Sequence, residues 1–214
     1  MGVVAAILLW IAVRMHANGR RHYVERFVFP STVKRKLAEA YPHLDAHQLS
    51  VILKGLREYF LVTQLARKKM VAMPSRAVDI AWHEFILCTH AYAVFCQKAF
   101  GYFLHHTPAE AMPAPHVARN SLKLAWKLAC QRAGINPLSP DKIPLLFAVD
   151  SQLQIPNGFF YHLPTMGADM AMPEKGMDPG TIGCSSGCGG DSGGGNSCCG
   201  DGCGGGGCGG CGGD

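Results

Sequence analysis

The last 32 residues of the chain, 183–214, contain no Val, Ile, Leu, Met or aromatic residue. They consist of 17 Gly, 7 Cys, 4 Ser, 3 Asp and 1 Asn. A segment of this composition has no apolar surface to bury, and glycine loses the most backbone entropy when it becomes ordered. The composition therefore predicts that this tail stays unfolded unless another part of the chain or a ligand holds it.

The sequence also lacks a Ser-His-Asp arrangement, a phosphate-binding loop, a dinucleotide fingerprint and any RNA- or DNA-binding motif. Its formal net charge of +5 is unevenly spread, because residues 14–70 hold 12 Lys/Arg and 4 Asp/Glu, whereas residues 71–182 hold 8 of each. Positive charge directly after an apolar N-terminus favours an anionic membrane surface over nucleic acid as the partner. We therefore expect contact with an anionic inner leaflet and no nucleic-acid binding.

The N-terminal residues Gly2 to Val13 are uniformly apolar, and Arg14, Arg20 and Arg21 follow them. A signal peptide carries its positive charge before the apolar run and ends in small residues at a cleavage site, and neither feature is present. The positive-inside rule then predicts a single membrane segment, with the body and the tail of the protein facing the cytoplasm.

The length of this apolar run is short for a membrane span. About thirteen helical residues extend over about 20 Å, whereas the hydrocarbon core of a bilayer is about 30 Å thick. Residues 1–14 are therefore interpreted as a minimal membrane anchor, or as one truncated by a start codon assigned too late. The alternative is a buried N-terminal helix of a soluble protein.

Residues 15–164 are predicted to form one mainly α-helical domain, a compact helical bundle. Leu44–Met70 is expected to be a helix because Asp45 can cap it and Gln48 completes a capping box three residues later. A second long helix is predicted over Arg76–Phe103, where core residues recur in alternating steps of four and three. The predicted core residues are Val78, Trp82, Phe85, Thr89, Tyr92, Cys96, Ala99 and Phe103. Shorter helices are predicted at 31–40, 116–133 and 139–153, and a small hairpin or coil at 155–163.

The second predicted helix and the residues after it are rich in groups that bind metal ions. Asp79 and His83 lie four residues apart and so share one side of a helix, and a pair of histidines at the helix end can fold back toward them. Sets of Asp and His suit zinc or iron, although this spacing matches no recognised zinc signature. The alternative is a structural Asp-His pair that fixes an imidazole tautomer. The candidate metal ligands are Asp79, His83, His105 and His106.

The same residues carry a resemblance to a known family. The run Met73-Pro-Ser-x-x-Val-Asp79-x-x-Trp82-His83-Glu-Phe-Ile-Leu, with the later Leu104-His105-His106, resembles the glycine-rich domain-containing protein-like family over about residues 25–160. The resemblance is to bacterial members with an N-terminal membrane segment and a Gly/Cys-rich end. It implies a helical domain without an established activity. The polar positions that match are Asp79, His83, Cys96, His105 and His106, whereas His90 is not among them.

A Met- and Pro-rich segment, 165–182, is predicted to be an extended linker to the tail, 183–214. Thiolates suit zinc or Cu(I), and flexible glycine lets several thiols surround one ion, as in a metallothionein. The alternatives are a low-complexity tail of reduced thiols and a substrate of a cysteine-modifying enzyme. The seven tail thiols belong to Cys184, Cys188, Cys198, Cys199, Cys203, Cys208 and Cys211.

These observations predict a membrane-anchored helical binding or scaffold protein whose thiol-rich tail binds Zn or Cu ions or a protein partner. A second hypothesis is a metal-dependent enzyme that uses Asp79, His83 and His105 or His106. A third is that the tail is the substrate of a cysteine-modifying enzyme. No complete catalytic set is recognisable, so no residue is assigned a catalytic role.

Overall fold

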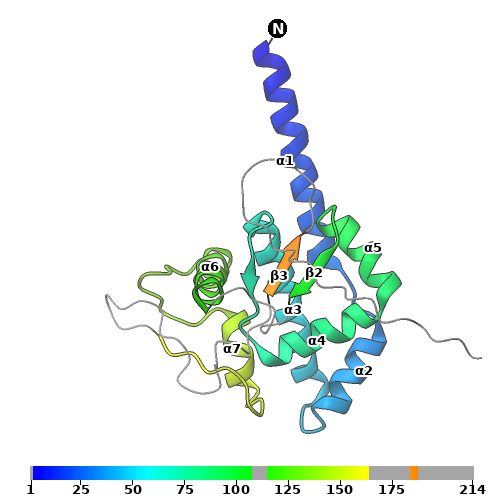
Figure 1. Ribbon diagram of the computed structural model, residues 1–214, viewed down its shortest axis with the longest axis vertical. Helices are drawn as coiled ribbons and strands as arrows, with labels where there is room; N and C mark the ends of the chain where they lie inside the picture. Colours follow the sequence, from blue (N-terminus) through cyan, green and yellow to red (C-terminus); the bar gives the residue numbers. More distant parts are fainter. Residues whose placement is uncertain (1, 108–114, 164–183, 188–214) are drawn as a thin grey trace, which may run out of the picture.

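A computed structural model describes residues 2–107, 115–163 and 184–187 of the protein. Most of these residues are helical and surround one hydrophobic core, which confirms the prediction of a mainly α-helical bundle (Figure 1). The helices are α1 (Gly2–Arg26), α2 (Ser31–Ala40), α3 (Ala46–Ala66), α4 (Arg76–Leu87), α5 (Thr89–Ala99), α6 (Pro115–Ala133) and α7 (Leu145–Gln152). The strands are β1 (Val71–Ala72), β2 (Leu104–Thr107) and β3 (Cys184–Gly187).

The central helix is α3, which contacts α1, α2, α4, α6 and α7. It begins where the sequence predicts, because the Asp45 carboxylate accepts a hydrogen bond from the backbone N–H of Gln48 at 2.7 Å. The Gln48 side chain accepts one in return from the backbone N–H of Asp45 at 2.8 Å, which completes the capping box. Fully buried side chains such as Ile52, Leu56 and Phe60 place α3 in the middle of the core.

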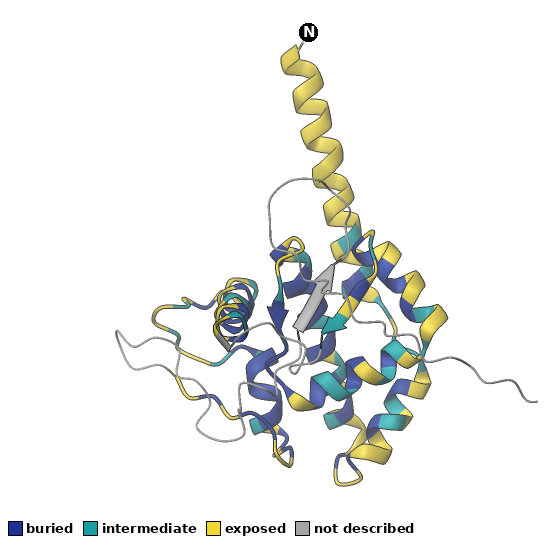
Figure 2. Ribbon diagram, in the orientation of Figure 1, coloured by how far each residue is buried: buried dark blue, intermediate teal, exposed yellow. Residues whose placement is uncertain are grey.

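The N-terminal helix α1 has two different halves (Figure 2). Its first part is exposed, and α1 is the one helix in the described residues that is long and apolar enough to cross a membrane. Its last turn joins the body, where Val24 is buried and the ring of Phe27, the next residue after the helix, lies 4.6 Å from the ring of Phe95. The helix continues without interruption past residue 14, so the apolar segment is rigidly connected to the body.

The predicted long helix over 76–103 is wrong in two respects. It is divided at Cys88 into α4 and α5, and α5 ends at Ala99. Thr89 and Phe103, which the spacing placed in the core, are exposed. The division has a tertiary cause, since α4 packs against α2 and α3, whereas α5 packs against α1, and a straight helix would not reach both.

A small antiparallel sheet in the order β1-β3-β2 was not predicted. The central strand β3 consists of the first four cysteine-tail residues after Gly183, so this short part of the tail is held by the body. In the register, Ser185 pairs with both Val71 and His106. The rest of the tail lies outside the described residues.

The last predicted helix begins later than expected. Its predicted start, at Ser139, precedes the observed first residue, Leu145, and Pro144 occupies the position before the helix. Pro144 lacks a backbone N–H and disfavours the helical conformation of the residue before it, so a helix begun at Ser139 would be broken there. Residues 155–163 form turns and coil rather than a hairpin.

Candidate metal site

Asp79 and His83 lie on the first turns of α4. Ser75 caps this helix, because its hydroxyl accepts a hydrogen bond from the backbone N–H of Val78 at 3.2 Å. The cap fixes where the helix starts and so sets which side of it carries Asp79 and His83. Asp79 Oδ2 and His83 Nδ1 are 3.6 Å apart, in agreement with the four-residue spacing in the sequence.

His106 reaches the same point from strand β2. Its Nε2 atom lies 3.0 Å from Asp79 Oδ1, and its ring centroid lies 4.2 Å from that of His83. The potential ligand atoms of Asp79, His83 and His106 all lie within 4.8 Å of one another. The fold therefore brings together three of the four side chains that the sequence singled out.

The fourth candidate, His105, is separated from this group. Adjacent residues in a strand project to opposite faces, so His105 and His106 cannot both turn toward Asp79. The His105 side chain is exposed, and its ring stacks at 4.8 Å against that of Phe103. Of the two histidines that the sequence offered as metal ligands, His106 therefore lies with Asp79 and His83, and His105 does not.

Two aromatic residues hold His106 in place. The indole ring of Trp82 lies 4.6 Å from the His106 ring, and its Nε1–H donates to the Tyr92 hydroxyl at 3.1 Å. Tyr92 in turn donates to the backbone carbonyl of Leu104 at 2.5 Å, which fixes the beginning of β2. Burial raises the pKa of Tyr92, so its hydroxyl keeps the proton that it donates. The sequence placed Trp82 and Tyr92 in the core, but their ten-residue separation gave no sign of this chain of hydrogen bonds.

The spacing and exposure of the three groups fit a divalent ion. A tetrahedral zinc ion with N and O ligands at about 2.0–2.1 Å separates its ligand atoms by about 3.3–3.4 Å. The two imidazoles approach different Asp79 oxygens, His106 Nε2 at 3.0 Å from Oδ1 and His83 Nδ1 at 3.6 Å from Oδ2, and all the potential ligand atoms lie within 4.8 Å of one another. The His106 side chain is only 10% exposed, whereas that of His83 is 49% exposed. The site is therefore closed on the sheet side and open to water on the other.

The body thiols do not contribute to this site. Cys96 and Cys130 are buried, and burial raises the pKa of Cys96 and that of Cys130, the latter to about 11. These thiols stay neutral and are poor metal ligands. Among the tail cysteines, Cys184 lies in β3 and pairs with Thr107, one residue beyond His106. The predicted ligands Cys188, Cys198, Cys199, Cys203, Cys208 and Cys211 lie outside the described residues.

Comparison with known proteins gives one match. Residues 19–183 match the family model described as UCP032817-like, so the match covers most of the body and the linker. A search of curated proteins and a search of solved structures returned no match. The resemblance to the glycine-rich domain-containing protein-like family is not tested by this match and stays a prediction.

Proposed function

Since the chain belongs to the UCP032817-like family, whose description specifies no activity, we propose from the geometry that it is a membrane-anchored metal-binding protein. One divalent ion is held by Asp79, His83 and His106. The observation that carries this proposal is the convergence of three ligand atoms within 4.8 Å from two separate elements, α4 and β2. Convergence across elements is more informative than Asp79 and His83 alone, because a pair on one helix is also common in surface ion pairs.

The donor set favours zinc or ferrous iron over copper. Two imidazoles and one carboxylate are the ligands of many zinc and non-haem iron sites, whereas Cu(I) prefers thiolate and thioether sulfur. Three protein ligands leave at least one coordination position for water on the side where His83 is exposed. A metal-dependent enzyme requires such an open position. The donor set therefore also supports the second hypothesis, a metal-dependent enzyme, with His106 as the third ligand.

The anchor is the apolar half of α1, and we place the body on the cytoplasmic side of the membrane. The support for this orientation is the row of arginines after Val13 and the absence of acidic residues before Glu25 in the sequence. In a reducing compartment the tail cysteines are thiols.

The thiol-rich tail supplies a second set of soft ligands for Zn or Cu, or a surface for a protein partner or a cysteine-modifying enzyme. The observation that favours a link between tail and body is the pairing of β3 with β2, which brings the backbone of Ser185 opposite His106. This pairing holds the first tail residues beside the proposed metal site. The tail and the body can therefore bind metal ions as neighbours.

The test uses the full chain in detergent, with all seven tail cysteines replaced by serine so that only the body can bind. Titration calorimetry with Zn²⁺ is expected to give one equivalent bound. In this background His106→Ala should weaken binding by more than about 100-fold, which exceeds the effect of typical outer-shell changes. The matched control is His105→Ala, which removes the neighbouring histidine on the other face of β2 and should bind as the parent does.

Two results would overturn the proposal: no bound Zn²⁺ in the serine-substituted parent, or equal affinities of the His106→Ala and His105→Ala variants. Circular dichroism and the urea midpoint of each variant, measured without metal, separate loss of binding from loss of folding. If the parent with intact cysteines binds Zn²⁺ and the serine-substituted chain does not, metal binding belongs to the tail alone.

A further inference from the structure

Cations gather where α1 enters the body. The three segments that meet there, 14–21, 64–70 and 98–103, contain no Asp or Glu. Figure 1 shows the turn after α3 and the turn after α5 at the end of the body from which α1 projects. We call this surface the basic collar, and its members are Arg14, Arg20, Arg21, Arg67, Lys68, Lys69 and Lys98.

Direct contacts hold the three segments together. The Arg20 guanidinium donates to the backbone carbonyl of Phe100 at 2.7 Å. Gly101 has a φ of 79°, and a Cβ atom there would collide with the Arg20 side chain, so glycine is needed for this approach. The Lys68 ammonium lies 5.9 Å from the centre of the Tyr102 ring, which joins the turn after α3 to the turn after α5.

The collar lies at the depth of lipid headgroups if the apolar half of α1 is in the bilayer. Arg14 follows the apolar run directly, and Arg20 is six residues further along a continuous helix, or about 9 Å. The headgroup layer on each side of the hydrocarbon core is about 5–8 Å thick. The collar therefore comes within one Debye length, about 8–10 Å, of the phosphate groups.

The turn after α3 is held in an unusual conformation. Arg67 and Lys68 have φ values of 48° and 68°, in the left-handed region that residues with a side chain adopt at an energetic cost. Both residues and the following Lys69 are exposed. Phe103, in the neighbouring turn, is 43% exposed, so an apolar side chain accompanies the cations. Cations together with an aromatic side chain are typical of surfaces at a membrane interface.

We propose that the basic collar binds the headgroups of anionic phospholipids and so holds the body against the membrane surface. The occupant is a lipid surface because the collar lies where the exposed apolar helix enters the body, and Arg21 is the one of its seven cations that pairs with a carboxylate in the described residues, that of Glu25 at 2.8 Å. This inference rests on the proposed anchor and is independent of the metal site.

The test compares the full chain in lipid nanodiscs of phosphatidylcholine alone with nanodiscs that also contain phosphatidylglycerol. Hydrogen–deuterium exchange reports the amides of residues 66–70 and 100–103. Exchange there should be at least about fivefold slower in the anionic discs, the factor that one lysine near an anionic surface contributes. The difference should disappear at 1 M salt, where the Debye length is about 3 Å.

The double variant Lys68→Ala/Lys69→Ala should lose most of this difference. The matched control, Lys34→Ala/Arg35→Ala, removes two cations from α2, at the opposite end of the body, and should keep it (Figure 1). Equal exchange in the two kinds of disc, or a difference that the Lys68→Ala/Lys69→Ala variant retains, would overturn the lipid contact. A chain that does not enter either disc would instead overturn the anchor.

Discussion

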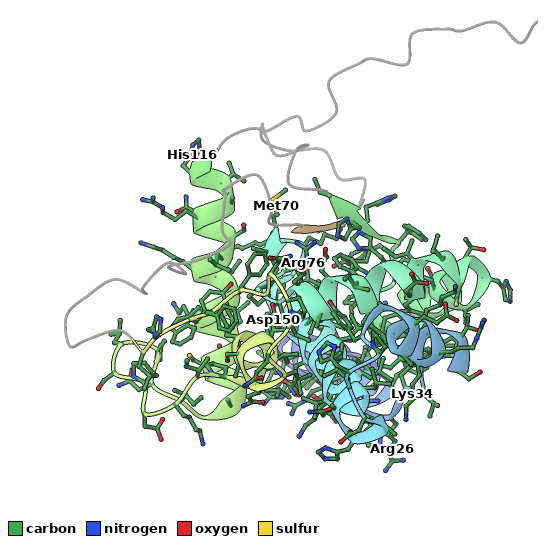
Figure 3. All side chains as sticks on the ribbon, turned by 90° about the horizontal axis from the view of Figure 1, so that it is seen from below. Arg26, Lys34, Met70, Arg76, His116 and Asp150 are labelled. Carbon is green, nitrogen blue, oxygen red and sulfur yellow. The ribbon has the colours of Figure 1, made fainter. Side chains whose placement is uncertain are left out.

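Two aspartates lie beside the beginning of α4, and their surroundings are opposite. Asp150, from α7, is 1% exposed, and Figure 3 shows it next to Arg76, the first residue of α4. Asp79, on α4 itself, is partly exposed, and its carboxylate lies within 4 Å of two imidazoles. The donors to the Asp150 carboxylate are Ser75 Oγ at 2.6 Å and the backbone N–H groups of Arg76 at 2.7 Å, Ala77 at 3.2 Å and Phe159 at 2.9 Å.

The difference between the two carboxylates is a difference in how their lone pairs are used. Four donors satisfy Asp150, and the N-terminus of α4 stabilises its charge, so it has no capacity left for an ion. Asp79 interacts with two imidazoles, which are metal ligands themselves. A saturated, buried carboxylate beside a helix start serves the structure, whereas an open carboxylate flanked by histidines has lone pairs available for an ion.

The largest expected effect is that of Asp150→Ala on stability. It leaves four donors without their acceptor and removes the link between α7, α4 and the coil at Phe159. The free energy of unfolding should fall by roughly 3–5 kcal/mol. Asp79→Asn should cost less than about 1 kcal/mol, because Asp79 is partly exposed and is not held by backbone donors. Urea denaturation of both variants, without metal, measures the two losses.

Asp141→Asn is the control for these two variants, since it changes an exposed aspartate in the loop before α7 and should leave the urea midpoint unchanged. Similar losses from Asp150→Ala and Asp79→Asn would contradict the distinction between a structural and a ligand carboxylate. The distinction would also be contradicted if the loss of Zn²⁺ binding among the three variants followed only their loss of stability.

The next effect in size concerns Trp82, whose ring contacts His106 beside Asp79. Trp82→Phe removes the hydrogen bond to Tyr92 and reduces the edge-on ring contact with His106. Metal affinity should fall by about 10–100-fold, as for other residues that orient a ligand histidine. Zn²⁺ titration of the chain with serine in place of the tail cysteines measures this change.

A second variant, with a buried aromatic residue changed outside the site, shows whether lost packing alone lowers the affinity for Zn²⁺. Phe147→Leu is that control, because Phe147 is buried in α7 and makes an edge-to-face contact with Trp126, with ring centroids 5.1 Å apart. It should lower the urea midpoint without changing the affinity for Zn²⁺. If Trp82→Phe and Phe147→Leu leave affinity equally intact, Trp82 has only a packing role.

The parts of the site that lie close together in the sequence could be predicted, and the parts that depend on distant segments could not. Asp79 and His83 were paired correctly because four residues bring them to one side of a helix, a rule that needs no other part of the chain. The choice between His105 and His106 could not be made, because it depends on strand β2, and β2 exists through pairing with β3 near the other end of the chain. Local periodicity carries no information about such a pairing.

The same reasoning applies to the fold. The beginning of helix α3 was predicted well because its cap at Asp45 is encoded within four residues. Its end was predicted wrongly, at Met70, because the left-handed conformation of Arg67 ends the helix at Ala66. The break at Cys88 was missed because neither proline nor glycine marks it and only the packing of α4 and α5 on different helices explains it. The role of Asp150 was also missed, since its donors come from residues 75–77 and 159.

The smallest effect concerns Tyr41. Burial, and then the charges of both carboxylates, Asp150 and Asp79, raise the pKa of its hydroxyl. Its hydroxyl is buried without a hydrogen-bond partner among the described residues. Burial raises the pKa of Tyr41 to about 12, and the negative charge of Asp150 raises it more than that of Asp79 does. Tyr41→Phe should therefore change the stability at neutral pH by less than about 1 kcal/mol, in the stabilising direction if at all, since the lost hydroxyl was unsatisfied.

The pH dependence of this variant has a definite sign. The unfolded tyrosine ionises near its usual pKa of 10.0 and the folded one near about 12, so the unfolded state releases the proton first. The contribution of the Tyr41 hydroxyl to the free energy of unfolding is fully present below pH 10 and is lost as the pH rises from 10 toward about 12. Urea midpoints across this range should fall more steeply for the parent chain than for Tyr41→Phe. Parallel curves would mean that Tyr41 ionises as freely in the folded protein as in the unfolded one, and that the Asp150 charge does not reach it.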